Sequence, residues 1–243
     1  MFEILIIILT FSLLIILHEL GHFLVAKKFG VRVDEFGLGL PPRLFSKRIG
    51  ETIFSFNLVP VGGFVKLYGE EKDVQDSQSF SGKPVWQRAL IIIAGCVAFW
   101  IVAAFLLSFI YGPIGGIQAT FDFTYTIIVV FIQVIESLVI GEALPVGVQV
   151  MGPVGIFDFM GNVLGMGIIY FIKLVAILAI HLAIFNLLPI PALDGGKLLF
   201  LGIEAIRGRP VPERIEQNIT AVFFFLLIGL IIFVSIQDII RIF

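Results

Sequence analysis

Four long apolar stretches constrain the fold of this chain more than any other feature of its sequence. They cover residues 4–26, 89–111, 165–188 and 219–236. A membrane-spanning helix needs about 17–25 predominantly apolar residues. The chain is 59% hydrophobic and 14% charged, whereas a soluble domain is about 45–50% apolar and about 25% charged. We therefore expect an α-helical integral membrane protein with four transmembrane helices, folded as a single domain 1–243 in the lipid bilayer.

The basic residues predict how these spans are oriented. Ten of the 16 Lys and Arg residues fall within 27–88, four more fall within 197–214, and the segment 112–164 has none. Cytoplasmic loops carry an excess of Lys and Arg. Four crossings then place both basic segments in the cytoplasm and both termini outside. We expect a multi-pass protein of the cell's inner (plasma) membrane.

A fifth apolar stretch, Thr120–Ile140, is interrupted by Asp122, Gln133 and Glu136. If it crossed the membrane, the basic segment 197–214 would move outside, against the charge rule. We therefore expect one interfacial or re-entrant helix here, packed on the outer side of the bundle.

The cytoplasmic stretch 31–68 differs in kind from the spans. Residues 31–36 and 52–58 alternate in part between apolar and polar side chains, as strands do. Pro60 and Gly62-Gly63 mark a turn before a further apolar run. We expect a small membrane-associated β-hairpin or meander over residues 31–68.

An ionisable cluster, His18-Glu19-Leu20-Gly21-His22, lies inside the first apolar stretch. Histidines four residues apart project from one face of a helix, where both can bind one metal ion. Glu19 between them can deprotonate a water molecule held by that metal. Ionisable groups are costly in hydrocarbon. We therefore interpret the cluster as a functional site rather than as an ordinary polar helix face.

A catalytic zinc takes three protein ligands and keeps one position for water, so a third ligand must come from elsewhere. Pro189 and Pro191 end the third span, and Asp194 follows them. With four crossings, Asp194 and the histidines lie at the cytoplasmic ends of their spans. We favour Asp194 as the third ligand of an active site near the cytoplasmic face. The alternative is an N-cap of the following helix.

These motifs resemble those of the site-2 protease family of intramembrane zinc metalloproteases, in the bacterial branch that cleaves membrane-bound anti-sigma factors. Residues 18–23 fit the family's HExGH motif, and residues 186–196 fit its NxxPxPxxDGG block. Residues 36–39, 60–66 and 152–156 fit further blocks. The resemblance covers most of the chain.

The resemblance implies a role for each matching residue. His18, His22 and Asp194 would bind Zn²⁺, and Glu19 would be the general base. Asn186 would hold the substrate backbone or steady the developing oxyanion, with a capping or packing amide as the alternative. An edge strand would pair with the unwound substrate by β-augmentation. The substrate-binding residues of that strand would be Gly62, Gly63, Phe64 and Val65.

The implied function is hydrolysis of peptide bonds in transmembrane segments of membrane proteins, such as anti-sigma factors or signal-peptide remnants. The branch often carries a PDZ domain between the second and third spans. Only 53 residues, many of them apolar, make up 112–164, so we expect this form to lack a PDZ domain. A net charge of −2 gives no reason to expect nucleic-acid binding.

Two other functions stay open from the sequence: a non-catalytic adaptor that binds membrane helices, and a metal transporter. Glu19 argues against an adaptor, which needs no base beside a metal. Ligands that converge at one depth argue against a transporter, which spreads them along a pathway. His181, in the third span, is interpreted as a hydrogen-bonded structural histidine, or else as part of a polar water path.

Overall fold

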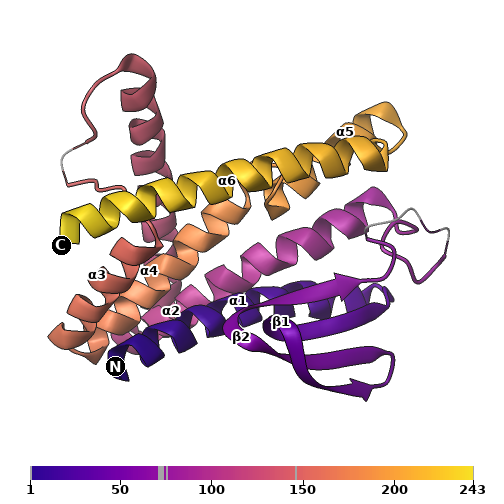
Figure 1. Cartoon of the computed structure of the whole chain (residues 1–243), viewed down its shortest axis with the longest axis horizontal. Coiled ribbons are helices and arrows are strands. Elements are labelled where there is room, and N and C mark those ends of the chain that lie inside the picture. The colour runs from indigo at the N-terminus through magenta and orange to yellow at the C-terminus, as the bar shows by residue number, and fades with distance from the viewer. Residues whose placement is uncertain (1, 71–73, 75, 146, 243) are drawn as a thin grey trace. The chain divides into compact units, whose positions relative to one another are not determined.

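A computed structural model of the protein describes residues 2–70, 74, 76–145 and 147–242. Within these ranges the chain is mainly helical, with one small sheet, so the expected class is confirmed (Figure 1). The elements are α1 (Phe2–Lys28), β1 (Val33–Ile49), β2 (Thr52–Leu67), α2 (Val85–Ile140), α3 (Pro153–Met166), α4 (Ile168–Asn186), α5 (Asp194–Arg207) and α6 (Glu213–Ile242).

Four of the described helices, α1, α2, α4 and α6, are long and apolar enough to cross a membrane. They correspond to the four predicted spans. The third was predicted from residue 165, but α4 begins at Ile168 because Gly167, with φ 125° and ψ 158°, separates it from α3. The direction in which each helix crosses, and the outer position of both termini, stay predictions.

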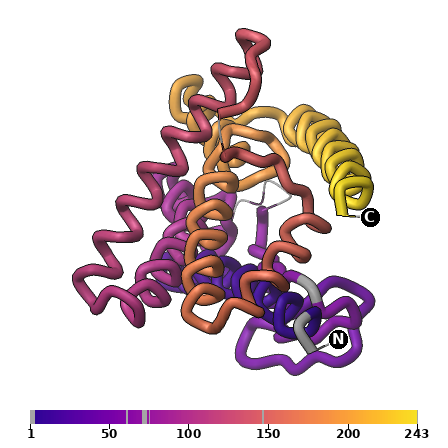
Figure 2. Tube along the Cα trace, turned by 90° about the vertical axis from the view of Figure 1, so that its left-hand side faces the viewer, coloured from indigo at the N-terminus to yellow at the C-terminus, as the bar shows by residue number. Residues whose placement is uncertain are grey.

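The predicted interfacial or re-entrant segment belongs to the second half of α2. Gly112 adopts φ 76° and ψ 168° and is followed by Pro113, so two helices meet there and the chain changes direction (Figure 2). The second helix packs against the first: the Trp100 indole Nε1 donates a hydrogen bond of 3.2 Å to Thr124 Oγ1. A Cβ on Gly116 would lie 2.6 Å from the Ser108 nitrogen. The interfacial or re-entrant placement of this helix stays a prediction.

The described chain forms two compact units. One contains Met1–Phe99 and Phe185–Phe224, and the other contains Trp100–Ile184 and Phe225–Phe243. The first unit holds the sheet, α1, the start of α2, and α5. Its core is built from the following buried apolar residues: Ala26, Val31, Val33, Leu67, Phe80, Ile91, Ile92 and Leu201. The single-domain organisation stays a prediction.

The second unit contains a buried carboxylate. Asp238 of α6 is only 2% exposed, and its Oδ2 accepts a hydrogen bond of 2.8 Å from the Gly155 N–H near the start of α3. A Cβ on Gly152 or on Gly155 would lie 2.8 Å from an Asp238 carboxylate oxygen. The two glycines of the 152–156 block therefore make room for the Asp238 carboxylate at the start of α3. A carboxylate near a helix N-terminus stabilises that helix.

The predicted β-region is a small antiparallel sheet of β1 and β2, which lies against α1 (Figure 1). The strands are longer than predicted because both bend: residues 35–38 pair with 63–66 and also with 53–56. Gly62, predicted in a turn, lies inside β2 with φ 84°, a conformation that glycine adopts without strain. Residues 63–67 pair only with the start of β1 and thus form one edge of the sheet.

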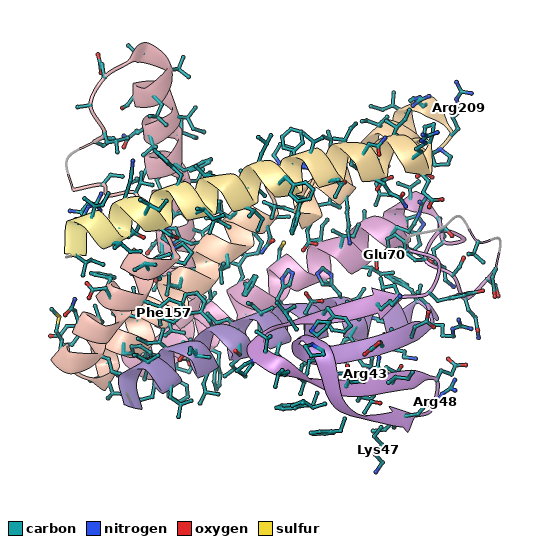
Figure 3. The ribbon with its side chains drawn as sticks, in the orientation of Figure 1. Arg43, Lys47, Arg48, Glu70, Phe157 and Arg209 are labelled. Carbon is teal, nitrogen blue, oxygen red and sulfur yellow. The ribbon has the colours of Figure 1, made fainter. Side chains whose placement is uncertain are left out.

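The rest of the sheet is a hairpin in which residues 43–49 pair with 52–57. Residues 40–49 are all exposed, and Lys47 points away from α1 (Figure 3). The edge formed by residues 63–67 is the one beside α1, since Gly63 approaches side chains of that helix. The bend of the strands therefore separates an exposed hairpin from the edge 63–67. That edge lies beside the turn of α1 that contains Glu19.

Candidate active site

Helix α1 carries His18, Glu19 and His22 within a little more than one turn. The two histidines are each only 7% exposed, so they lie inside the unit rather than on its surface. Gly21 lets α1 approach α2 closely, because a Cβ there would lie 2.4 Å from the Ala94 carbonyl oxygen. The helix therefore presents its polar turn to α2 at short range.

Three side-chain atoms converge beside this turn. His18 Nε2 lies 3.1 Å from His22 Nε2, and Asp194 Oδ2 lies 3.2 Å and 3.3 Å from these two nitrogens. Tetrahedral zinc with ligand bonds of about 2.0–2.1 Å holds its ligand atoms about 3.3–3.4 Å apart. The three atoms thus match one face of a zinc coordination tetrahedron. They are the one group of this kind among the described residues.

The hydrogen bonds around the cluster favour a cation at its centre. His22 Nδ1 lies 2.8 Å from the Ile91 carbonyl oxygen, which requires the proton on Nδ1. In the neutral ring, Nε2 then carries a lone pair, and this lone pair faces the Asp194 Oδ2 acceptor at 3.3 Å. This close approach of two acceptor atoms needs a proton or a cation between them, and a metal ion bound to both histidines and Asp194 meets that need. The Ile91 carbonyl orients the His22 ring as an outer hydrogen-bond partner of a metal ligand does.

Asp194 reaches the histidines because the chain turns sharply after α4. Pro189 and Pro191 interrupt helical pairing, and α5 begins at Asp194 itself. The N-cap is Leu193, so the alternative of Asp194 as an N-cap is wrong. Burial alone would raise the pKa of the Asp194 carboxyl, but the adjoining His18 and His22 rings hold it well below its usual range. The cluster therefore includes one anionic ligand atom.

Two glycines hold α5 against this turn. A Cβ on Gly195 would lie 2.1 Å from the Leu188 carbonyl oxygen, and one on Gly196 would lie 2.4 Å from the Ile190 carbonyl oxygen. Any side chain at either position would push α5 away from residues 188–190. The glycine pair therefore sets the position of Asp194, the residue directly before it.

Gly95 of α2 is a residue that the sequence reasoning missed. A Cβ on it would lie 2.3 Å from His22 Nε2 and 2.6 Å from His18 Cε1. The two imidazoles thus occupy the space that a side chain at position 95 would fill. The sequence signal was weak: a lone glycine in an apolar span. Phe99, one turn later, stacks on the His18 ring with centroids 4.7 Å apart.

Glu19 faces the sheet edge. Its Oε2 accepts a hydrogen bond of 3.0 Å from the Val65 N–H. Beside this contact lies a cavity of about 140 Å³. The residues that line it are Glu19, His22, Phe64, Val65, Leu67, Glu70, Ile91, Ile92, Asp194 and Lys197. The candidate base, one candidate ligand from each of α1 and α5, and the sheet edge therefore meet in one place.

The other residues predicted for substrate binding lie as follows. Gly63 packs beside α1, where a Cβ would lie 3.8 Å from Glu19 Cγ, and Gly62 precedes it at the bend of β2. Asn186 is the last residue of α4 and is not among the residues that line the cavity. His181 Nδ1 lies 2.9 Å from the Ile177 carbonyl oxygen of its own helix, as expected of a structural histidine.

Lys197 and Glu70 also line this cavity. The Lys197 ammonium lies 2.5 Å from Glu70 Oε1. Partial burial would lower the pKa of Lys197, but the neighbouring Glu70 carboxylate raises it above its usual value, and Asp194 and Glu19 add to this effect. The cavity wall thus carries an ion pair, whose ammonium lies one helical turn beyond Asp194.

Known proteins resemble this chain over most of its length. The model of peptidase family M50 matches residues 6–230. A Clostridium perfringens protein whose name places it among the zinc metalloproteases is 28% identical, over 96% of this chain and 97% of that protein. The regulator of sigma-W protease RasP of Bacillus subtilis is 23% identical, over 97% of this chain and 98% of RasP.

A similar Thermotoga maritima protein is 45% identical over 105 residues, which cover 41% of this chain and 21% of that protein. The Clostridium alignment runs over 326 positions although this chain has 243 residues, so at least 83 positions have no counterpart here. The match to the family model covers nearly the whole chain. The chain belongs to peptidase family M50, the site-2 protease family, and is a zinc-dependent metalloprotease with membrane-spanning helices.

Proposed function

We propose that the protein is an intramembrane protease in which His18, His22 and Asp194 hold the zinc ion and Glu19 is the general base. The observation that carries this proposal is the triangle of Nε2, Nε2 and Oδ2 atoms with sides of 3.1–3.3 Å. Glu19 lies in the same helical turn and lines the adjoining cavity. Convergence of the ligands at one point favours hydrolysis over metal transport.

Zinc, when bound, polarises a scissile carbonyl and lowers the pKa of water to about 7. Glu19 then accepts the proton of the attacking water and donates it to the leaving amine. Asn186 is proposed to hold the substrate backbone or to steady the oxyanion from the end of α4. The His22 ring keeps its orientation during these steps because Ile91 accepts its Nδ1–H.

The sheet edge supplies the second part of the mechanism. A peptide bond in a helix is shielded by its own turn, so the substrate must become extended before cleavage. Residues 63–67 form an edge strand, which is the kind of strand that a further strand can pair with. We propose that the substrate pairs with this edge along Gly62, Gly63, Phe64 and Val65. A paired substrate takes the Val65 N–H and thereby releases the Glu19 carboxylate for proton transfer.

The proposed substrates are transmembrane segments of membrane proteins, including anti-sigma factors or signal-peptide remnants. The name of RasP assigns that relative to the regulation of a sigma factor, which supports the first class. The short segment 112–164, with 53 residues, supports the absence of a PDZ domain between the second and third spans. The basic segments 27–88 and 197–214 support an active site near the cytoplasmic face and termini outside.

Purified protein in lipid vesicles tests the proposal, with a peptide that spans the vesicle membrane as substrate. We expect cleavage within the apolar segment, loss of cleavage with a zinc chelator, and recovery on addition of Zn²⁺. Mass spectrometry of the fragments locates the cut. Cleavage only outside the apolar segment, or cleavage that persists without zinc, contradicts the proposal.

A further inference from the structure

The cavity beside Glu19 is lined by residues of α1, α2, α5 and the sheet edge, and two of its walls come from distant parts of the chain. One wall is α5, which supplies Asp194 and Lys197, and the other is the sheet edge, which supplies Val65 and Leu67. An extended substrate must fit between the metal and this edge. The width of the gap therefore decides whether a scissile bond can reach Glu19.

A single ion pair connects the two walls directly in the described structure. Lys197 Nζ of α5 lies 2.5 Å from Glu70 Oε1, three residues beyond the end of β2. Glu70 lies just past the end of that strand (Figure 3). Its side chain is 21% exposed and that of Lys197 is 46% exposed, so the pair lies at the mouth of the cavity.

Glu70 is attached to a firmly braced segment. The Tyr68 N–H donates to the Arg32 carbonyl at 2.9 Å, and the Phe80 N–H donates to the Tyr68 carbonyl at 2.7 Å. Phe80 is only 7% exposed and belongs to the core of this unit. Backbone hydrogen bonds therefore connect the segment just before Glu70 to Arg32 and to the core residue Phe80.

Lys197 belongs to the same helix as the candidate metal ligand Asp194. It lies three residues after Asp194 and thus on the same side of α5. The far end of this helix is held by a second ion pair, between Arg88 of α2 and Glu204. Both side chains of that pair are nearly buried. Helix α5 is therefore held by an ion pair near each of its two ends.

We propose that Lys197 and Glu70 form a positioning pair, which fixes the gap between the metal ligand Asp194 and the substrate-pairing edge 63–67. Neither side chain takes part in proton transfer. Their role is to hold an extended substrate strand at the depth where Glu19 and the metal act on it. This inference rests on the proposed function, because it concerns the geometry of that same site.

Three variants test the pair in the full chain in lipid vesicles: Lys197→Met, Glu70→Gln and the double variant. We expect each single change to raise KM for the transmembrane peptide about fivefold, which is the size of effect that a partly exposed ion pair can have. We expect kcat to change less than KM, and the zinc content to stay that of the wild type. The double variant should cost no more than either single change, since both remove the same interaction. Lys197→Arg should restore the wild-type KM.

A matched control is Lys27→Met, which removes an ion pair with Glu51 at 3.9 Å away from the cavity. It should leave KM unchanged. Hydrogen exchange of amides 63–67 gives a readout that does not need turnover: it should become faster in Lys197→Met and stay unchanged in Lys27→Met.

Unchanged KM and unchanged exchange in Lys197→Met would overturn the inference, and so would loss of zinc or additive effects in the double variant. If the wild-type protein cleaves no transmembrane peptide, the proposed function fails instead. The exchange of residues 63–67 then still decides whether the pair holds the edge.

Discussion

Glu19 Oε2 accepts a 3.0 Å hydrogen bond from the Val65 N–H, so the candidate base is tied to the edge of the sheet. This contact joins the two halves of the proposed chemistry, proton transfer and substrate pairing. The amide that holds Glu19 is the one that an incoming strand would use. Substrate binding and release of the base are therefore expected to occur together.

Replacing Val65 by proline removes this amide hydrogen. We expect Val65→Pro to lower cleavage at least tenfold, because the edge loses a pairing group and proline disfavours strand pairing. Zinc content should remain that of the wild type, since no metal ligand changes. Turnover of a membrane peptide measures cleavage, and metal analysis of the same sample measures zinc content. Val65→Ala keeps the N–H and is the control; equal loss in both variants would contradict a role of the amide.

Gly95→Ala should remove zinc while the helices persist. In a helix interior, alanine is otherwise more favourable than glycine by about 1 kcal/mol, but here the new methyl group would lie 2.3 Å from His22 Nε2. The rings must move, and the metal triangle opens. Zinc content and circular dichroism test this expectation. Val97→Ala, at a 40% exposed position on the same helix, should keep its zinc. A Gly95→Ala protein with full zinc content would refute the claim that Gly95 makes room for the two histidine rings.

Asp238→Ala should lower thermal stability without affecting zinc. The change leaves the half-buried Gly155 N–H without its Asp238 partner, which costs about 1 kcal/mol, the low end of the range for a lost partner. The melting temperature in detergent measures the effect. Gln237→Ala, at the exposed neighbouring position, should melt like the wild type. An unchanged melting temperature for Asp238→Ala would show that the buried carboxylate does not stabilise the second unit.

The sequence predicted those features that follow from composition and short-range spacing. The apolar lengths predicted the helices able to span a membrane, and the spacing of His18 and His22 predicted that their rings would meet. Asp194 was selected because the third ligand had to lie at the same depth. The structure places all three together, and their role as ligands is tested by the experiments proposed here.

Other features depend on tertiary packing and left no local signal. Gly95 makes room for imidazoles 73 and 77 positions earlier in the chain, and one glycine in an apolar span does not reveal that. Residues 37–49 contain Pro41 and Pro42, which argue against a strand, yet pairing with β2 extends β1 through them. The helix after Gly112 folds back because Gly116 allows close contact with Ser108, a pairing that periodicity alone does not indicate.

The central claim is that His18, His22 and Asp194 hold one zinc ion and that Glu19 moves the proton. It is tested most directly by measuring zinc content and turnover on the same sample of Glu19→Gln. The amide keeps the size of the side chain but cannot act as a base at neutral pH. We predict one zinc ion per chain and no cleavage of the membrane peptide. Cleavage at the wild-type rate, or a zinc-free protein, would contradict the claim.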